Sequence, residues 1–248
     1  MRVLLLGGTT EASALAQTMA QTAVDAVFSY AGRTDSPIEQ PLPTRTGGFG
    51  GIQGLADFIS AENITHVVDA THPFAAQISN NAVAACQMKN TPLIAFVRAQ
   101  WVVQPGDTWL DVADTEAAVA ALPTEPARIF LAIGKQTLAA FASKPQHFYL
   151  LRLVDAPDAD LPLPNTQVVI DRGPFTVTGD LALLRAHAIT HVIAKNAGGK
   201  GASAKLQAAR QLQLPVIMIA RPAIADRPIA SNVAAVMDWL HHSARLGV

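Results

Sequence analysis

Short apolar runs alternate along this chain with longer stretches in which apolar residues recur at helical spacing. The first run, from Val3 to Leu6, predicts a buried strand. Leu15, Ala16 and Met19 then share one face of a predicted helix over 11–19. Buried apolar strands that alternate with amphipathic helices are typical of parallel sheets covered by helices. The pattern therefore predicts an α/β protein.

The alternation continues to the end of the chain. Further strands are predicted at 24–30, 44–46, 64–70, 92–97, 128–133, 147–153, 167–170, 191–195 and 215–220. Helices are predicted at 75–89, 115–122, 136–142, 177–187, 202–212 and 232–242. Ligands of parallel α/β sheets bind beyond the carboxyl ends of the strands, so the polar residues at those ends are the candidates for chemistry.

Two similar pentapeptides about half a chain apart indicate two domains of one topology. Residues 64–68 (ITHVV) and 189–193 (ITHVI) each precede a polar loop and a helix. Trp101 and Trp109 lie between the halves, and we expect them to pack in the seam between two domains. The expected divisions are a first domain over 1–100, a crossover over 101–122 and a second domain over 123–248.

Composition narrows the classes of partner. Half of the 248 residues are hydrophobic, 15% are charged and the formal net charge is −1. This balance is typical of a globular protein and argues against a general affinity for nucleic acid or for an anionic membrane. The single cysteine, Cys86, excludes an internal disulfide, and we expect neither a signal peptide nor a membrane span. A cytoplasmic location is expected.

The turn after the first strand predicts an anion site. A glycine turn at a helix N-terminus directs free backbone N–H groups and the positive end of the helix dipole at one point. The residues expected to bind a cofactor pyrophosphate there are Gly7, Gly8, Thr9, Thr10 and Glu11. Thr9 stands where dinucleotide-binding turns have their middle glycine, and the two threonine hydroxyls are expected to donate to phosphate oxygens. The alternative is a tight strand-to-helix connection without a ligand.

The end of the second strand bears on the choice of cofactor. Gly32 and Arg33 follow that strand, and no acidic residue is placed to bind an unphosphorylated ribose. A guanidinium at this point suits the 2′-phosphate of NADP. Arg45 is expected to join Arg33 at the phosphate, and Gly47 and Gly48 to bring a second backbone loop to the cofactor. A solvated arginine and a flexible loop are the alternatives.

The strand predicted at 64–70 ends in Ala70 and Thr71, with His72 directly after them. In a parallel sheet these residues lie where the nicotinamide of a dinucleotide binds, so Ala70 and Thr71 are cofactor candidates. His72 is a catalytic candidate, and a structural histidine is the alternative.

Basic residues follow five successive strands of the second half. Because these strand ends share one edge of a sheet, they predict a ligand with several carboxylates or phosphates, although each residue alone suits a solvated surface charge. The substrate candidates are Lys135, Arg152, Arg172, Gly198, Gly199, Lys200 and Arg221, and Lys195 is a second catalytic candidate. The sequence has no P-loop, no metal-ligand spacing and no serine-hydrolase motif, and no metal is expected.

Several motifs together identify a resemblance that runs over essentially the whole chain. They are Gly7-Gly8-Thr9-Thr10-Glu11-Ala12, Ala31-Gly32-Arg33, Arg45-Thr46-Gly47-Gly48-Phe49-Gly50, Asp69-Ala70-Thr71-His72-Pro73-Phe74-Ala75, Arg172-Gly173-Pro174-Phe175 and Lys195-Asn196-Ala197-Gly198-Gly199. The chain thereby resembles the precorrin-6A reductase (CobK/CbiJ) family of cobalamin biosynthesis. The resemblance implies two Rossmann-like domains with parallel sheets flanked by helices and a cleft between them.

The resemblance also implies an activity. Members reduce one carbon–carbon double bond of a tetrapyrrole that bears many carboxylates, with hydride from a nicotinamide cofactor, here expected to be NADPH. Transient contacts with other enzymes of corrin synthesis are expected as well. Two alternatives stay open: a cobalt-precorrin-6A reductase of the anaerobic route, and a non-catalytic NADP-binding sensor. His72, Lys195 and water are the candidate proton donors.

Overall fold

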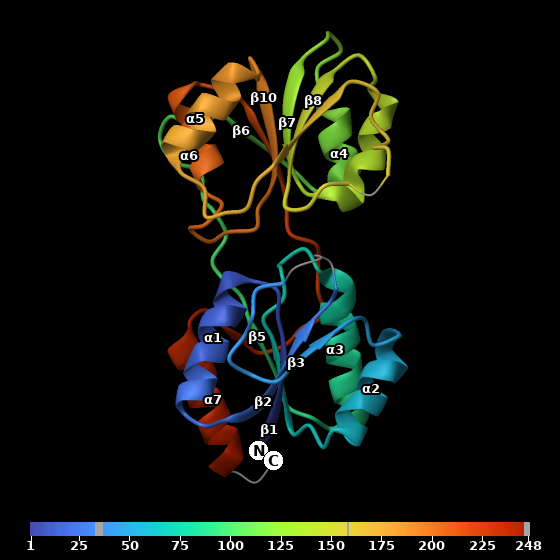
Figure 1. The fold of residues 1–248 in the computed structure, drawn as a ribbon, viewed down its shortest axis with the longest axis vertical. Coiled ribbons are helices and arrows are strands. Elements are labelled where there is room, and N and C mark those ends of the chain that lie inside the picture. Colours follow the sequence, from blue (N-terminus) through green and yellow to red (C-terminus); the bar gives the residue numbers. More distant parts are fainter. Residues whose placement is uncertain (33–36, 158, 246–248) are drawn as a thin grey trace. The chain divides into compact units, whose positions relative to one another are not determined.

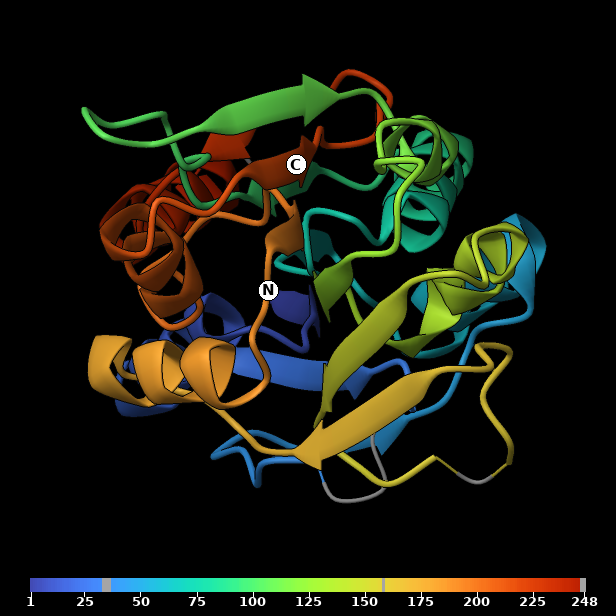
Figure 2. The ribbon, with the colours of Figure 1, turned by 90° about the horizontal axis from the view of Figure 1, so that it is seen from above.

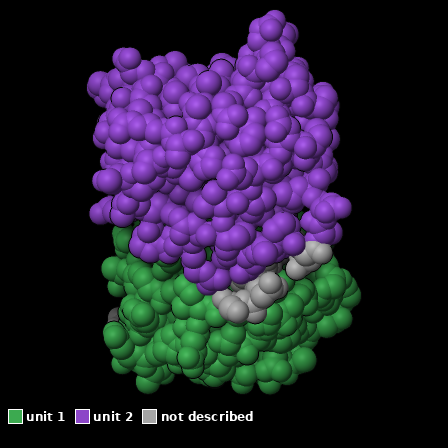
Figure 3. All heavy atoms as spheres, turned by 45° about the horizontal axis from the view of Figure 1, so that its top comes forward, with its two compact units in different colours: residues 1–99, 223–248 green, residues 100–222 purple. Residues whose placement is uncertain are grey.

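The computed structural model describes residues 1–32, 37–157 and 159–245. Its chain divides into two compact units. Unit 1 comprises Met1–Ala99 and Ala223–Val248, and unit 2 comprises Gln100–Pro222 (Figure 3). Within the described residues, no helix has the length and apolar character needed to cross a membrane.

Unit 1 is built on a parallel sheet. Its described strands are β1 (Arg2–Leu6), β2 (Asp25–Tyr30), β3 (Thr44–Thr46), β4 (His66–Asp69), β5 (Leu93–Phe96) and β12 (Ile229–Ala230). They lie in the order β12-β5-β4-β1-β2-β3, and all their pairings are parallel. Leu4 of the central strand is opposite Val27 on one side and Val67 on the other. The prediction of a parallel α/β fold is confirmed.

The helices of unit 1 cover both faces of this sheet (Figure 1). Val3 and Leu5 pack with α1 (Thr10–Gln21) and α7 (Val233–Arg245). Leu4 and Leu6, which point to the other face, pack with α2 (Gly51–Ala61) and α3 (Ala76–Lys89). The continuous apolar run of β1 thus reflects burial on both sides.

Unit 2 repeats this architecture. Its described strands are β6 (Trp109–Val112), β7 (Arg128–Ala132), β8 (Phe148–Leu153), β9 (Thr166–Ile170), β10 (His191–Lys195) and β11 (Val216–Ile219), in the parallel order β6-β11-β10-β7-β8-β9. Helices α5 (Val177–Ala186) and α6 (Ala204–Gln211) lie on one face. Helix α4 (Thr115–Ala120) and the 3₁₀ segment η1 (Lys135–Ser143) lie on the other (Figures 1 and 2).

The expected division of the chain is wrong at two places. Residues 223–248, assigned to the second domain, belong to unit 1, because Val236, Met237 and Leu240 bury their side chains in the cluster formed with α1 and β1. The expected crossover over 101–122 is part of unit 2, where it supplies β6 and α4. Its two tryptophans pack against the core of unit 2 itself. Each sheet therefore has an edge strand whose neighbour in the sheet is distant in sequence, β12 beside β5 in unit 1 and β6 beside β11 in unit 2.

The internal repeat is confirmed in its hydrogen bonds. Thr65 Oγ1 accepts from the backbone N of Arg2 at 2.9 Å and donates to its carbonyl at 3.1 Å. In unit 2, Thr190 Oγ1 makes the same two bonds to Arg128, both at 3.1 Å. The two units share a local design at the amino ends of their central strands.

Buried histidines lie at these same ends. His66 is 1% exposed and His147 is 0% exposed, and the Nε2 atom of each has no hydrogen-bond partner. Burial lowers the pKa of His66, helped by the N-terminal charge. Burial also lowers the pKa of His147, helped by Lys144 and His191. The native state therefore favours the neutral form of both rings.

Acid should destabilise the protein through these two rings. The unfolded chain takes up protons near a pKa of about 6.5, whereas the native rings do so only at lower pH, so the free energy of unfolding falls as the pH drops below about 6.5. Each ring contributes a slope of at most about 1.4 kcal/mol per pH unit. Urea unfolding across this range should show a smaller pH dependence for the double variant His66→Gln/His147→Gln. An unchanged pH dependence would contradict the assignment.

Candidate functional site

The carboxyl edge of the sheet in unit 1 collects residues that follow five strands, β1 to β5. Backbone pairing fixes their places: Gly7 N donates to Ser29 O at 3.0 Å, and Ala70 N donates to Leu6 O at 2.9 Å. The turn after β1 therefore lies between the ends of β2 and β4. Of the residues predicted to bind a cofactor, the described ones all belong to this unit.

The two glycines of the first turn serve different purposes. A Cβ on Gly7 would lie 2.0 Å from Cζ of Phe28, so packing against that ring requires a glycine. Gly8 has φ of +114°, and a Cβ there would meet nothing within 4 Å. Its exposed backbone thus borders open space at the start of α1, where the first N–H groups of the helix have no intrahelical partner.

The threonine hydroxyls of this turn are used within the protein. Thr9 caps α1 by accepting from Ala12 N at 3.1 Å, and its own proton goes to Ala70 O at 2.9 Å. Thr10 donates to Glu11 Oε2 at 3.0 Å. The expectation that these hydroxyls donate to phosphate oxygens does not fit these bonds, because each hydroxyl has one proton. Backbone N–H groups are left as the donors of the turn.

An ion pair at this edge was not predicted. Arg98, two residues beyond β5, places Nη1 2.8 Å from Oε2 of Glu11, and the side chains are 18% and 23% exposed. The sequence carries a signal for it, because Arg98 follows a strand of the first half just as the basic candidates follow strands of the second half. Both side chains line a small hollow that is open to solvent, together with Thr9, Thr71, Pro73 and Phe96.

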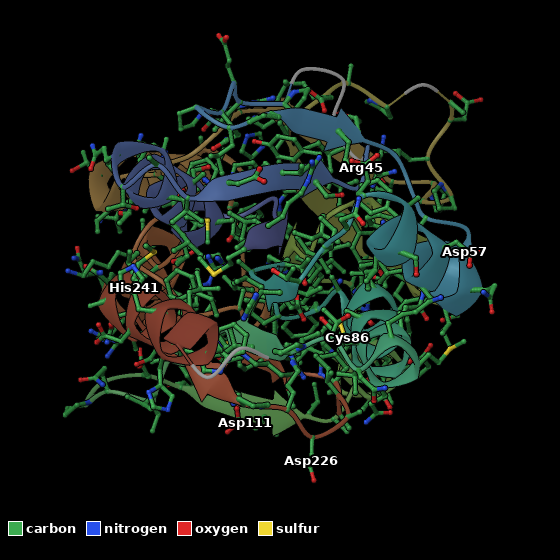
Figure 4. The ribbon with its side chains drawn as sticks, turned by 90° about the horizontal axis from the view of Figure 1, so that it is seen from below. Arg45, Asp57, Cys86, Asp111, Asp226 and His241 are labelled. Atoms are coloured by element: carbon green, nitrogen blue, oxygen red, sulfur yellow. The ribbon has the colours of Figure 1, made fainter. Side chains whose placement is uncertain are left out.

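Arg45 organises the glycine loop after β3. Its guanidinium donates to Ser29 Oγ at 2.8 Å, Gly47 O at 2.9 Å and Gly48 O at 3.2 Å. It also lies 4.0 Å from the ring centroid of Phe49, between β3 and α2 (Figure 4). Burial lowers the pKa of Arg45. The residue shapes the loop that was expected to approach the cofactor, and contact with a phosphate remains a prediction.

Gly32 and Arg33 are the two cofactor candidates that follow β2 in the sequence. Gly32 has φ of +73°, a backbone conformation that favours glycine, and it lies next to Gly47. Arg33, predicted to bind the 2′-phosphate, lies outside the described residues.

The end of β4 holds a buried carboxylate. Asp69 Oδ1 accepts from Thr71 Oγ1 at 2.6 Å and from Thr71 N at 3.2 Å. Its Oδ2 lies 3.6 Å from Nη2 of Arg227, which comes from the returning C-terminal segment. Burial and the Asp69 charge raise the pKa of the Cys86 thiol on α3 to about 12 (Figure 4). His72 is exposed, and its Nδ1 accepts from Phe74 N at 3.2 Å.

The basic residues of unit 2 lie at or after the ends of parallel strands, as predicted, and Arg152 and Arg221 are engaged with neighbouring loops and helices. Arg152 is ion-paired with Asp180 in the first turn of α5 and lies 3.5 Å from the ring centroid of Phe175. Arg221 donates to Asn196 O and Ala197 O, each at 3.0 Å. These contacts argue for loop support over substrate contact at both positions.

The loop 195–200 is held from a second side as well. The Asn196 side chain bonds both N and O of Trp101, and the Trp101 indole donates to Gly199 O at 2.8 Å. Gly198 and Gly199 have φ of +70° and +79°, which favours glycine at both. Burial lowers the pKa of Lys195. Lys135, Arg172 and Lys200 are exposed, and Arg172 Nη2 lies 3.6 Å from Asp155 Oδ1.

No cluster of three or more metal-binding side chains occurs in the part of the chain that the structure describes.

Comparisons with known proteins agree on one family. A family model described as precorrin-6x reductase CbiJ/CobK matches residues 2–241. A precorrin-6A reductase of Rhodobacter capsulatus is 62% identical over 239 residues, covering 96% of this chain and 95% of the relative. A cobalt-precorrin-6A reductase of Priestia megaterium is 30% identical over 256 residues, covering 98% and 99%. A solved CobK precorrin-6A reductase structure has a TM-score of 0.94 at 62% identity, covering 98% of this chain and 96% of that one.

Arg152→Met should destabilise unit 2. The change leaves Asp180, whose side chain is 2% exposed, as an uncompensated buried charge, and losing one partner of a buried pair costs about 3–5 kcal/mol. Arg172→Met, on a side chain that is 43% exposed, is the matched control and should cost about 0.5 kcal/mol or less. Chemical denaturation followed by circular dichroism measures both. Equal losses would refute a structural role particular to Arg152.

Proposed function

The chain belongs to the precorrin-6x reductase CbiJ/CobK family of cobalamin biosynthesis, and on that premise we propose that it reduces precorrin-6A with NADPH. The reaction adds hydride to one carbon of a double bond and a proton to its neighbour, giving the dihydro product precorrin-6B. The class of reaction follows from membership of this family. The choice of NADPH and the residues that bind each reactant are proposed from the strand ends.

The observation that carries the cofactor assignment is the open backbone at Gly8. A positive φ, empty space where a Cβ would point, and the N-terminus of α1 together fit a pyrophosphate held by backbone N–H groups. Gly7 through Glu11 would hold the pyrophosphate, Arg33 with Gly32 the 2′-phosphate, and Ala70 with Thr71 the nicotinamide end. NADPH, when bound, supplies the hydride.

Unit 2 would bind the macrocycle. Precorrin-6A bears many carboxylates, and the exposed groups Lys135, Arg172 and Lys200 offer cationic contacts for them. Arg152 and Arg221 would support this surface through their partners in the protein. Lys195, whose pKa is lowered by burial, and His72 are the proposed proton donors. We also propose a cytoplasmic location and transient contacts with other corrin-pathway enzymes.

Metal-free substrate is favoured over the cobalt complex. The precorrin-6A reductase relative is 62% identical, against 30% for the cobalt-precorrin-6A reductase relative. The enzyme should therefore oxidise NADPH faster with precorrin-6A than with its cobalt complex. A sensor would bind NADPH without oxidising it.

Arg33→Ala should weaken the binding of NADPH but not that of NADH. Losing a charge-assisted contact to the 2′-phosphate costs about 1.5–3 kcal/mol, or about 10- to 150-fold in affinity, while NADH, which lacks that phosphate, should be nearly unaffected. Fluorescence titration gives both affinities. Stopped-flow absorbance with precorrin-6A then reports NADPH oxidation. Equal losses for both cofactors would refute the contact.

Arg172→Gln/Lys200→Gln should raise the KM for precorrin-6A. Each partly exposed contact is worth about 1 kcal/mol, so the KM of the double variant should rise about 30-fold. The rise should be smaller at high salt, because salt screens these contacts. The charge-matched control is Lys89→Gln/Arg185→Gln. Both residues lie in the last turns of their helices, α3 and α5, away from the carboxyl edges of the sheets. NADPH affinity should stay constant in both. Loss of NADPH binding with intact substrate binding would show that the roles of the two units are reversed.

A further inference from the structure

We propose that Thr71 recognises the carboxamide of the nicotinamide as a hydrogen-bond acceptor, and that Asp69 and Arg227 are positioning residues that impose this role. The inference rests on the proposed function, because it takes the ligand at the end of β4 to be a nicotinamide nucleotide. It assigns a specificity contact within that site.

The proton of the Thr71 hydroxyl is already used. Thr71 Oγ1 donates to Asp69 Oδ1 at 2.6 Å, and the Thr71 backbone N donates to the same oxygen at 3.2 Å. A threonine hydroxyl has one proton and two lone pairs. Toward any other group Thr71 is therefore an acceptor.

One lone pair has a partner on α3. Ser79 Oγ lies 3.3 Å from Thr71 Oγ1, and Ser79 is 2% exposed. Since the Thr71 proton points to Asp69, Ser79 is the donor in this pair. A second lone pair of Thr71 is left for a ligand.

Asp69 and Arg227 fix this arrangement. Their side chains are 2% and 9% exposed, and Asp69 Oδ2 lies 3.6 Å from Arg227 Nη2. The guanidinium balances the carboxylate charge, and a hydrogen bond to an ionised carboxylate is stronger than one between neutral groups. The Thr71 hydroxyl is therefore held in one orientation. Arg227 acts on the ligand only through Asp69 and Thr71.

The hollow beside Thr71 has matching chemistry. Pro73 and Phe96 give it an apolar wall. Thr9 also lines it with a hydroxyl whose proton goes to Ala70 O, and Glu11 lines it with a carboxylate paired to Arg98. Arg98 lines the hollow too and contributes N–H donors, while Thr71, Thr9 and Glu11 contribute the acceptors. A carboxamide offers two N–H donors to them, whereas a methyl ketone of the same shape offers none.

Binding of two oxidised cofactors tests the assignment: NADP and its acetylpyridine analogue, in which a methyl ketone replaces the carboxamide. Isothermal titration gives both dissociation constants without turnover. The wild type should bind NADP about fivefold more tightly than the analogue, as expected for one neutral hydrogen bond. Thr71→Val should weaken the binding of NADP about fivefold and leave the affinity for the analogue unchanged. Thr71→Ser, which keeps the hydroxyl, should retain the wild-type preference.

Arg227→Gln should remove the same preference, and Arg227→Lys should restore part of it, with circular dichroism as the control for folding. Equal weakening of both ligands by Thr71→Val would overturn the proposal, as would an Arg227→Gln variant that keeps the wild-type preference. If the wild type binds both ligands equally, the Thr71 assignment fails and the proposed function stands. If it binds neither, the proposed function itself fails.

Discussion

The pairing of β1 with both β2 and β4 is the constraint on which the site in unit 1 depends. It sets Gly7 against Ser29 and Ala70 against Leu6, and it seats the Phe28 ring where any side chain on Gly7 would lie. Thr9 then joins the turn to the end of β4 through Ala70. The result is a turn fixed from two neighbouring strands, so the exposed N–H groups at the start of α1 are ordered before any ligand arrives.

The repeated fold has diverged at the equivalent turn of unit 2. The amino ends of β4 and β10 keep the same threonine bonds to the neighbouring strand. After β7, however, Gly134 leads into the 3₁₀ segment η1, with no side-chain cap at its start. A 3₁₀ segment has poorer hydrogen-bond geometry than an α-helix such as α1. Divergence at this one turn is consistent with a dinucleotide in unit 1 and a different ligand in unit 2.

Much of the fold could be predicted from the sequence, because buried strands leave continuous apolar runs and helices leave periodic ones. The two edge strands could not. β12 has two described residues, and β6 contains Asp111 and an exposed Leu110, so neither produces an apolar run. The amphipathic pattern of α7 predicts that a surface covers it, but the pattern is the same whichever sheet supplies that surface. The helix was therefore assigned to the wrong unit.

Among the site residues, the glycines could be identified from the sequence, but the roles of the arginines could not. Glycines at strand ends were identified because few other roles explain them there. Arginines were harder, since a guanidinium has the same sequence signature whether it contacts a ligand or supports a loop. Arg152 is held by Asp180, which lies far from it in the sequence, and Arg45 folds back on carbonyls of its own loop, a conformation that the sequence does not reveal. Arg227 lies far from Asp69 in the chain, and only the return of the C-terminal segment pairs them.

That return has a consequence for synthesis. Unit 2 is continuous over Gln100–Pro222, whereas unit 1 needs β12 and α7 from the last part of the chain. Until those residues leave the ribosome, the face of β1 that carries Val3 and Leu5 has α1 but lacks α7. Domains generally fold in the order of synthesis, the N-terminal one first. In this protein the second unit is complete in the nascent chain while the first still lacks its final strand and helix, so the order of completion is inverted.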